Sequence, residues 1–303
     1  MNWLLLAFIA PLLWAISNFI DKFLISKYFK GGSGTLVMFS CFIALPVAIL
    51  ILIFKPSVLD VNISTALLMT LIGFISISYL FPYLKALNQA DTSTVIPIFQ
   101  IIPVFNYFLS FIILGEILSK SQILASLMIL IGAVGISLKF DGRKTKLRGN
   151  IVFLMILASL IVSLNAVLFK FFAIELDYWT VSFWEYLGSL IFGIILFIGV
   201  KSYRSDFISS LKRNGKNILG LNTINETVNV IAVMIFSYAL LLAPIALVSV
   251  INGFQPFFVF LIGLFLTIFA PHLIKEDLSK KILLQKVVFI LLMFIGAYLL
   301  QSS

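Results

Sequence analysis

Long apolar stretches separated by short polar connections run along the whole chain. Ten can be distinguished, each close to the ~20 residues that an α-helix needs to cross about 30 Å of hydrocarbon. They cover residues 3–25, 34–54, 65–87, 93–115, 121–139, 149–173, 179–200, 217–241, 245–269 and 282–301. None is a short run of alternating polarity like an outer-membrane strand, and in lipid a helix satisfies its own backbone groups. The pattern predicts an all-α polytopic membrane protein with ten transmembrane helices.

The composition agrees with a chain that is solvated by lipid. Of its 303 residues, 62% are hydrophobic and 11% are charged, and the mean hydropathy is +1.17. A soluble domain has about 25% charged residues, because its surface must face water. The net charge of +9 is carried in short loops with no basic stripe interleaved with aromatic residues. This arrangement argues against a nucleic-acid partner and leaves membrane lipid as the expected surrounding.

Cysteine and histidine are too scarce for most site chemistry. Cys41 is the single cysteine and lies in an apolar stretch, whereas His272, the single histidine, lies in a polar loop. A disulfide, a Cys-based metal site and a histidine relay therefore lack their residues. The sequence also lacks the phosphate-binding loop of nucleotide hydrolases. We expect no metal, no cofactor and no enzymatic activity.

Basic residues are concentrated on one side of the predicted membrane, in the loops that follow odd-numbered segments. These residues are Lys27, Lys30, Lys139, Arg143, Lys144, Lys146, Arg148, Lys201, Arg204, Lys212, Arg213, Lys216, Lys275, Lys280 and Lys281. The other side carries little beyond Lys55 and Lys120, with Glu175 and Asp177 as counter-signals. Because cytoplasmic loops are enriched in Lys and Arg, we predict a plasma-membrane protein with both termini extracytoplasmic.

The chain contains a weak internal repeat. Residues 86–105 align without a gap on residues 239–258, which superposes Pro103 on Pro256. Near the end of each half, Gly132-Ala133 matches Gly296-Ala297. Five segments per half is an odd number, so the two halves must insert with opposite orientation. We predict two inverted five-helix repeats, residues 1–140 and 148–303, with a substrate site near the midplane between them.

The same residues resemble a known family. The stretch LLWAISNFIDKF in the first segment, followed by Ala86-Leu87, Ala90, Pro103-Val104, Gly115-Glu116, Gln122 and Gly132-Ala133, is similar to the EamA-type drug/metabolite transporter superfamily. Two departures stand out: Ala125 replaces a usual glycine, and Ile268-Phe269 stands in place of Gly-Glu in the second repeat. The resemblance implies ten helices in two EamA repeats and the transport of small organic metabolites through a central cavity.

The eighth segment carries a polar stripe. Asn222, Asn225, Glu226 and Asn229 follow one another at i, i+3, i+4 and i+7, which places them within one helical arc of about 100°. Because a central charge costs about 2.5–3.5 kcal/mol on insertion scales, such residues usually face a cavity or a partner. Glu226 would then neutralise an amine-bearing substrate or carry a coupling proton. Alternatively, it pairs with a buried lysine or stays protonated as a packing contact.

Polar residues occur at bilayer depth in other segments as well. Trp14 and Asn18 share a face of the first segment, and Tyr79 and Tyr83 share a face of the third, although tyrosine is also a common interface anchor. In the fourth and ninth segments, amide side chains accompany prolines, which free helical carbonyls. The candidate substrate-binding residues are Trp14, Asn18, Tyr79, Tyr83, Gln100, Asn106, Asn165, Asn225, Glu226, Asn229, Asn252 and Gln255.

Lys170 and Glu185 should lie at similar depth in the sixth and seventh segments, so we expect them to form a structural ion pair. For the whole chain, the leading hypothesis is a secondary transporter of a small polar, amino-acid-like or amine-bearing metabolite. Its alternatives are a lipid-carrier flippase or a drug exporter on the same scaffold, and a membrane-embedded enzyme. The sequence leaves the substrate, transport direction, coupling ion and oligomeric state open.

Overall fold

The structure is a computed structural model that describes residues 3–27, 33–87, 89, 96–137, 149–269 and 279–302. All elements within these ranges are helical. They are α1 (Trp3–Lys27), α2 (Ser33–Phe42), α3 (Ala44–Phe54), η1 (Pro56–Leu59), α4 (Ile63–Ser78), α5 (Leu80–Leu87), η2 (Ile96–Ile101), α7 (Ile102–Leu114), α8 (Lys120–Ser137), α9 (Gly149–Glu175), α10 (Tyr178–Gly199), α11 (Lys201–Leu242), α12 (Ile245–Ile251), η3 (Asn252–Phe254), α13 (Gln255–Phe269) and α14 (Lys280–Ser302). The prediction of an all-α chain is confirmed.

Nine helical stretches in the described ranges are long and apolar enough to cross a membrane. They are Trp3–Asp21, Leu36–Phe54, Ile63–Ala86, Lys120–Ser137, Gly149–Glu175, Tyr178–Gly199, Ile218–Leu242, Ile245–Phe269 and Ile282–Ser302. The expected fourth segment appears as the shorter apolar helix Ile98–Leu114. The chain is therefore a multi-pass membrane protein, and nine of the ten expected crossings have full length within the residues that the structure describes.

The connection between the seventh and eighth segments is helical, whereas the sequence predicted a loop. The basic residues before the eighth segment continue its helix, so that α11 has 42 residues. Apolar side chains explain this extension: Phe207, Leu211 and Ile218 pack with Leu24 and Phe39. The helix is thus amphipathic before it enters the apolar stretch. The expected basic loop at 139–148, as well as Lys275 and His272, lies outside the described residues.

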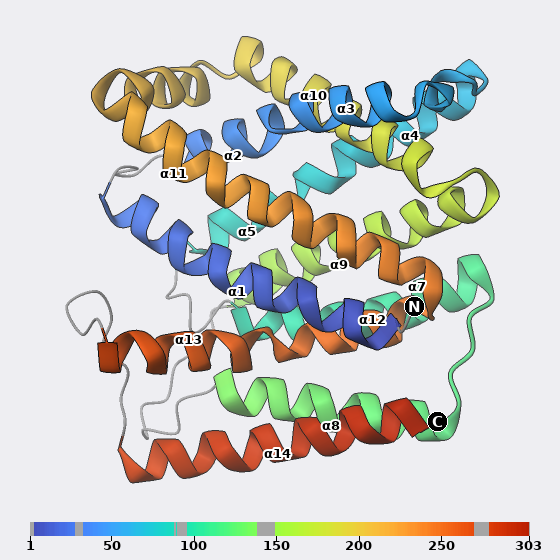
Figure 1. Ribbon diagram of the computed structural model, residues 1–303, viewed down its shortest axis with the longest axis vertical. Helices are drawn as coiled ribbons and strands as arrows, with labels where there is room; N and C mark the ends of the chain where they lie inside the picture. The colour runs from blue at the N-terminus through green and yellow to red at the C-terminus, as the bar shows by residue number, and fades with distance from the viewer. Residues whose placement is uncertain are drawn as a thin grey trace.

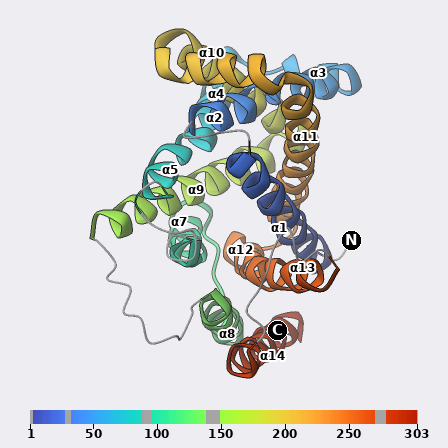
Figure 2. The same cartoon turned by 90° about the vertical axis from the view of Figure 1, so that its left-hand side faces the viewer.

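The helices run roughly side by side and stack along the long axis of the molecule (Figure 1). The α8–α14 pair lies at one end of this axis, and α10 lies with α3 and α4 at the other, as Figure 2 also shows. Both chain termini lie at the right-hand end of the helices in Figure 1, opposite the N-terminal part of α11.

Contacts between the two halves recur in matching pairs. The first helix of each half packs on the third and fourth segments of the other: α1 on α11 and α13, and α9 on α4 and α7. Likewise, α2 packs on α11, whereas α10 packs on α4. The transition from 3-10 to α-helix also falls at corresponding places, one residue before Pro103 in α7 and one residue before Pro256 in α13.

The α8–α14 pair shows the same correspondence in detail. A Cβ on Gly132 would collide with Phe289 and Met293, and a Cβ on Gly296 would collide with Ala125 and Ile129. The sequence interval between Gly132 and Gly296 equals the interval between Ala125 and Phe289 and that between Ile129 and Met293. Each helix thus presents the same surface to the other, which is the property of an isologous contact around a two-fold axis.

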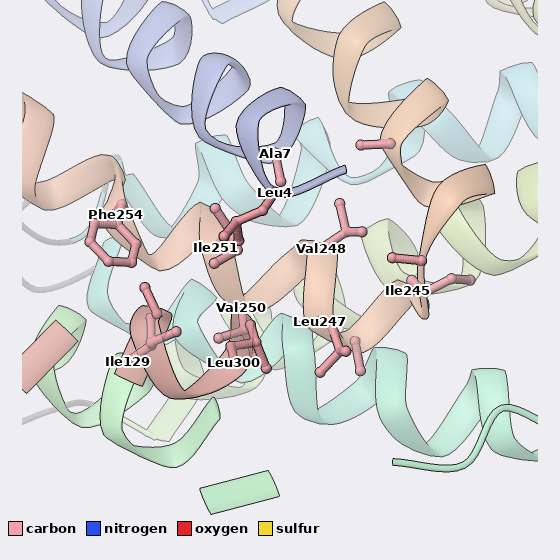
Figure 3. Close-up of a cluster of buried hydrophobic side chains, with 14 of the residues drawn as sticks. Leu4, Ala7, Ile129, Ile245, Leu247, Val248, Val250, Ile251, Phe254 and Leu300 are labelled. Atoms are coloured by element: carbon pink, nitrogen blue, oxygen red, sulfur yellow. The ribbon is translucent and has the colours of Figure 1, made fainter. Parts of the chain in front are cut away.

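The largest apolar core surrounds α12, all seven residues of which are buried (Figure 3). Its side chains meet Leu4 and Ala7 of α1, Ile129 of α8 and Leu300 of α14. A second close approach joins α4 to α10, where the missing side chains of Gly73 and Gly188 let each helix touch the backbone of the other. Small residues of this kind allow helices to pack tightly without a hydrophobic driving force.

Candidate substrate site

The polar stripe of α11 faces α1. Trp14 Nε1 donates to Asn229 Oδ1 at 2.9 Å, and Ser17 Oγ donates to Asn225 Oδ1 at 2.8 Å. The other end of the same amide is also used, because Asn225 Nδ2 donates to Asp21 Oδ1 at 2.6 Å. Residues spaced three or four apart on both helices make this ladder possible, since they lie on one face of each helix.

Glu226 lies at the centre of this polar group and is 5% exposed. Ser40 Oγ of α2 donates to Glu226 Oε1 at 3.0 Å. Asp21 lies within electrostatic range of Glu226, and Tyr79 within range of both carboxylates. We call Trp14, Ser17, Asp21, Ser40, Asn225, Glu226 and Asn229 the Glu226 cluster. Both acids accept hydrogen bonds from neutral donors, and no Lys or Arg among the described side chains bonds to either, so neither has a cation to compensate its ionised form.

Two predicted aromatic residues adjoin the Glu226 cluster. The rings of Tyr79 and Tyr83 are 6.4 Å apart, and Tyr83 lies 5.2 Å from the ring of Phe99. Both tyrosines are half-buried. Tyr79 marks the junction between α4 and α5, so its side chain projects where the helix is interrupted.

Asn18 is exposed although it does not lie on the apolar outer face of α1. The exposed apolar residues Leu5, Ile9, Leu12 and Ile16 share one face of this helix. At 100° per residue, Asn18 lies roughly opposite to that face, about 150° away. Asn18 is nevertheless exposed. Its side chain therefore points toward the interior of the helix assembly and away from the apolar outer face.

The predicted amides near the prolines divide into separate groups. Asn106 Nδ2 donates to Ser249 Oγ and so joins α7 to α12 in the core, which makes it a packing contact. Gln100 Oε1 lies 3.5 Å from the position of a Cβ on Gly253, and thus faces the corresponding turn of the other half. Asn252 has a buried Oδ1 without a hydrogen-bond partner, and Gln255 is half-buried. Within the described part of the chain, no hydrogen bond joins these four amides to the Glu226 cluster.

The expected ion pair between Lys170 and Glu185 is wrong. Glu185 Oε1 instead accepts from Asn165 Nδ2 at 3.1 Å. Lys170 Nζ contacts Glu116 Oε1 at 2.5 Å and donates to the carbonyl of Ala243 at 2.7 Å. Equal depth in two helices does not make two side chains face each other, and Lys170 points toward the α7–α8 connection. Asn165 therefore belongs to a second polar pair with Glu185, outside the Glu226 cluster.

Glu116 and Lys170 form a buried link between the halves. Glu116 Oε2 also accepts from the backbone N–H of Ile245 at 2.8 Å. One ion pair thus connects α9 and the α7–α8 connection to both sides of Pro244. A cavity of about 560 Å³ lies beside it, lined by both charged residues and by Leu242, Ala243 and Pro244. We call this set of contacts the Glu116–Lys170 latch.

At the same end, Lys55 Nζ lies 2.6 Å from Asp177 Oδ1 near the surface. Burial alone would raise the pKa of Asp177. Its hydrogen bonds with Lys55, Thr180 and Trp179 outweigh that effect and hold the pKa below its usual value. Asp177 also caps α10 by accepting from two backbone N–H groups of the first turn.

The candidate residues predicted from the sequence did not include Ser17, Asp21 and Ser40 of the Glu226 cluster, or Glu116 of the latch. Ser40 is a lone hydroxyl in an apolar stretch, and such a residue gives no pattern. Glu116 was noticed only as part of the Gly-Glu pair, without its partner. Within the described ranges, no three His, Cys, Asp or Glu side chains come together as a metal site would require.

Comparison with known proteins agrees with this architecture. No curated protein matches the chain. Among 24 matching chains of known structure, one is titled only "Crystal structure of protein"; it is 16% identical, has a TM-score of 0.68, and the match covers 99% of this chain and 98% of that one. That likeness concerns the fold. Residues 1–138 match the sequence model of the EamA-like transporter family. Residues 1–138, slightly less than half of the chain, thus resemble the EamA-like transporter family.

Proposed function

We propose that this protein is a secondary transporter that moves a small polar organic metabolite, amino-acid-like or amine-bearing, across the plasma membrane. The observation that carries the proposal is the Glu226 carboxylate, which is buried in the membrane-spanning region and hydrogen-bonded by a neutral hydroxyl. An intramembrane carboxylate without a cationic partner is expensive and is usually found at a substrate or ion path. Glu226 is also the candidate carrier of a coupling proton.

We infer alternating access between two inverted repeats, with the short helix Ile98–Leu114 as the tenth crossing. The matching inter-half contacts and the self-corresponding α8–α14 surface support this arrangement. Two arrangements of such repeats open the same central site to opposite sides of the membrane. In the arrangement seen here, the Glu116–Lys170 latch ties the halves together at the end that carries the termini.

The termini are proposed to be extracytoplasmic. Both lie at the end of the molecule that holds the α3–α4 and α9–α10 connections, where Lys55 is balanced by Asp177. The opposite end carries the basic start of α11, with Lys201, Arg204 and Lys212 among the described residues. The positive-inside rule then assigns this opposite end to the cytoplasm.

A flippase or a drug exporter on the same scaffold remains the alternative function. A flippase would need the polar site to open sideways to lipid. Asn18 opposes this alternative, because its exposed amide points away from the apolar outer face of α1.

The experiment that tests the proposal begins with a thermal-shift screen of purified protein against metabolite pools, because a ligand that binds only the folded state stabilises it. The active compound is then measured in proteoliposomes without nucleotide. We expect uptake above that of protein-free liposomes. Uptake that requires ATP, or chemical conversion of the compound, would contradict a secondary transporter.

A further inference from the structure

We infer that Asp21, Asn222 and Glu226 bind the primary ammonium group of the transported molecule. This assignment rests on the proposed function and makes its substrate class specific. It adds to the Glu226 cluster an asparagine that has no part in the hydrogen bonds described above. It also predicts that the site distinguishes primary amines from quaternary ammonium compounds, although both carry the same charge.

Asn222 is the first observation. Its side chain is completely buried, and both its Oδ1 and its Nδ2 lack a hydrogen-bond partner. A buried amide in this state has lost its water without gaining a replacement, which costs stability. At 100° per residue, Asn222 projects from α11 about midway between Asn225 and Glu226. Its unused amide is therefore directed to the same side as the two residues that bind Asp21 and Ser40.

The surroundings of Asn222 fix its level in the membrane. Ile218, one turn earlier, packs against Leu24 of α1 and Phe39 of α2. Glu226, one turn later, is bonded to Ser40, the residue after Phe39. Asn222 thus lies between these two contacts, at the level where Asp21 precedes Leu24 by one turn.

The two carboxylates supply the remaining acceptors. Asp21 accepts a hydrogen bond from Asn225 Nδ2, and Glu226 accepts one from Ser40 Oγ. A carboxylate has about four lone-pair sites, so each retains the capacity to accept more hydrogen bonds. No Lys or Arg among the described side chains is recorded as bonded to either group. A bound cation would therefore neutralise the negative charge of the two carboxylates, which their neutral hydrogen-bond donors do not.

A primary ammonium group matches this set of acceptors. It has three N–H donors and no acceptor, and the site offers the Asp21 and Glu226 carboxylates and the Asn222 carbonyl oxygen. A quaternary ammonium group has no N–H donor and is recognised instead by the faces of aromatic rings. Trp14 is already engaged, since its Nε1 donates to Asn229 and its ring lies 5.5 Å from Phe236. The geometry favours recognition by hydrogen bonds.

The test compares two probes of equal charge, n-butylamine and butyltrimethylammonium, by thermal shift on the purified full-length protein at constant ionic strength. We expect the primary amine to bind at least about tenfold more tightly than its trimethylated analogue, because the analogue has no N–H donors to form hydrogen bonds with the charged groups. Equal binding, or a preference for the quaternary compound, would overturn the assignment. Stabilisation by sodium ions that the amine does not increase would assign the site to sodium instead.

The variant Asn222→Leu removes the unused amide at nearly constant volume. We expect it to weaken n-butylamine binding about tenfold and to raise the melting temperature of the ligand-free protein, since an unsatisfied buried group disappears. Glu185→Gln, a buried carboxylate outside the cluster, should leave amine binding unchanged. Undiminished binding in Asn222→Leu would overturn the assignment; if this variant does not fold, Asp21→Asn must show the loss. Should neither amine bind although uptake of a metabolite depends on Glu226, the inference fails and the proposed function stands.

Discussion

At the scale of single residues, the buried polar side chains of this protein differ in whether they have hydrogen-bond partners. Asn225 uses both ends of its amide, whereas Asn222, one turn away, uses neither. Neutral hydrogen bonds between helices in membranes contribute only about 0.6 kcal/mol each, so packing alone gives little reason to bury an unpaired amide. We therefore interpret Asn225 as a residue that positions its neighbours, and Asn222 as a candidate ligand of the substrate.

Part of this site was predictable from the sequence. The spacing of Asn225, Glu226 and Asn229 fixed a common face, and Trp14 in the first segment proved to be its partner. The Lys170–Glu185 pair failed because spacing along one helix says nothing about which neighbour a side chain meets. Glu116 could not be chosen as the partner of Lys170 without knowledge of the turn at Gly115, whose φ is 68°.

Asp177 provides a prediction about pH. Because its pKa is lowered in the folded protein, its ionised form contributes stability above the unfolded pKa of about 3.9. This contribution is lost as the pH falls through the lower folded pKa. Asp177→Asn should therefore reduce stability at pH 7 by up to about 1 kcal/mol, as is typical of exposed ion pairs. The difference in melting temperature between the two proteins should shrink below about pH 4. A difference that is constant from pH 7 to pH 3 would contradict this account.

At the scale of helices, apolar length predicted existence and approximate bounds well. It failed at the basic stretch before Ile218, which is helical because Phe207 and Leu211 bury an apolar face against α1 and α2. In the fourth segment, a 3-10 turn precedes Pro103. Hydropathy alone could not predict either feature, because the first depends on tertiary contacts and the second on the backbone at a proline.

The Glu116–Lys170 latch joins helix ends and gives a prediction about them. Lys170→Met leaves the Glu116 carboxylate buried without its cation, which should lower the free energy of unfolding by roughly 3–5 kcal/mol. Thermal denaturation in detergent measures this loss. The double variant Lys170→Met with Glu116→Gln should recover part of it, because no unpaired charge remains.

Opening of the same end can be measured separately. A second cavity of about 440 Å³ shares Leu242, Ala243 and Pro244 with the cavity beside the latch and is also lined by the buried Leu247. In a Cys41→Ala background, which has no other cysteine, Leu247→Cys places a thiol at the wall of this second cavity. Glu116→Gln should increase labelling of this thiol by a water-soluble maleimide several-fold. Unchanged labelling together with reduced stability would show that the latch supports the fold without controlling access.

At the scale of the whole molecule, the proposed correspondence between the two repeats is incomplete at one informative place. The alignment that superposes Pro103 on Pro256 also superposes Glu116 on Phe269. The second half thus lacks the acid that would complete an equivalent latch. If the halves exchange arrangements, the end with the termini is the one that an ion pair holds closed. The sequence showed this substitution, but its meaning depended on the partner of Glu116.

The topology is tested by a reporter that fluoresces only in the cytoplasm. Fused after Ser303, it should stay dark, because the lopsided distribution of Lys and Arg assigns both termini to the outside. The same reporter fused to a chain truncated after Arg213 should be bright. A bright signal at the C-terminus would invert the proposed orientation, and with it the side that the latch closes.

The central claim is that Glu226 serves transport, and one substitution tests it most directly. Glu226→Gln keeps the shape and hydrogen-bonding capacity of the side chain but removes its charge and its titration. In proteoliposomes, uptake of the screened substrate should fall at least tenfold or lose its dependence on pH, while the protein remains folded. Glu185→Gln, the matched change at the other buried carboxylate, should retain wild-type uptake. Wild-type rates and an unchanged pH profile in Glu226→Gln would make Glu226 a structural residue and contradict the account.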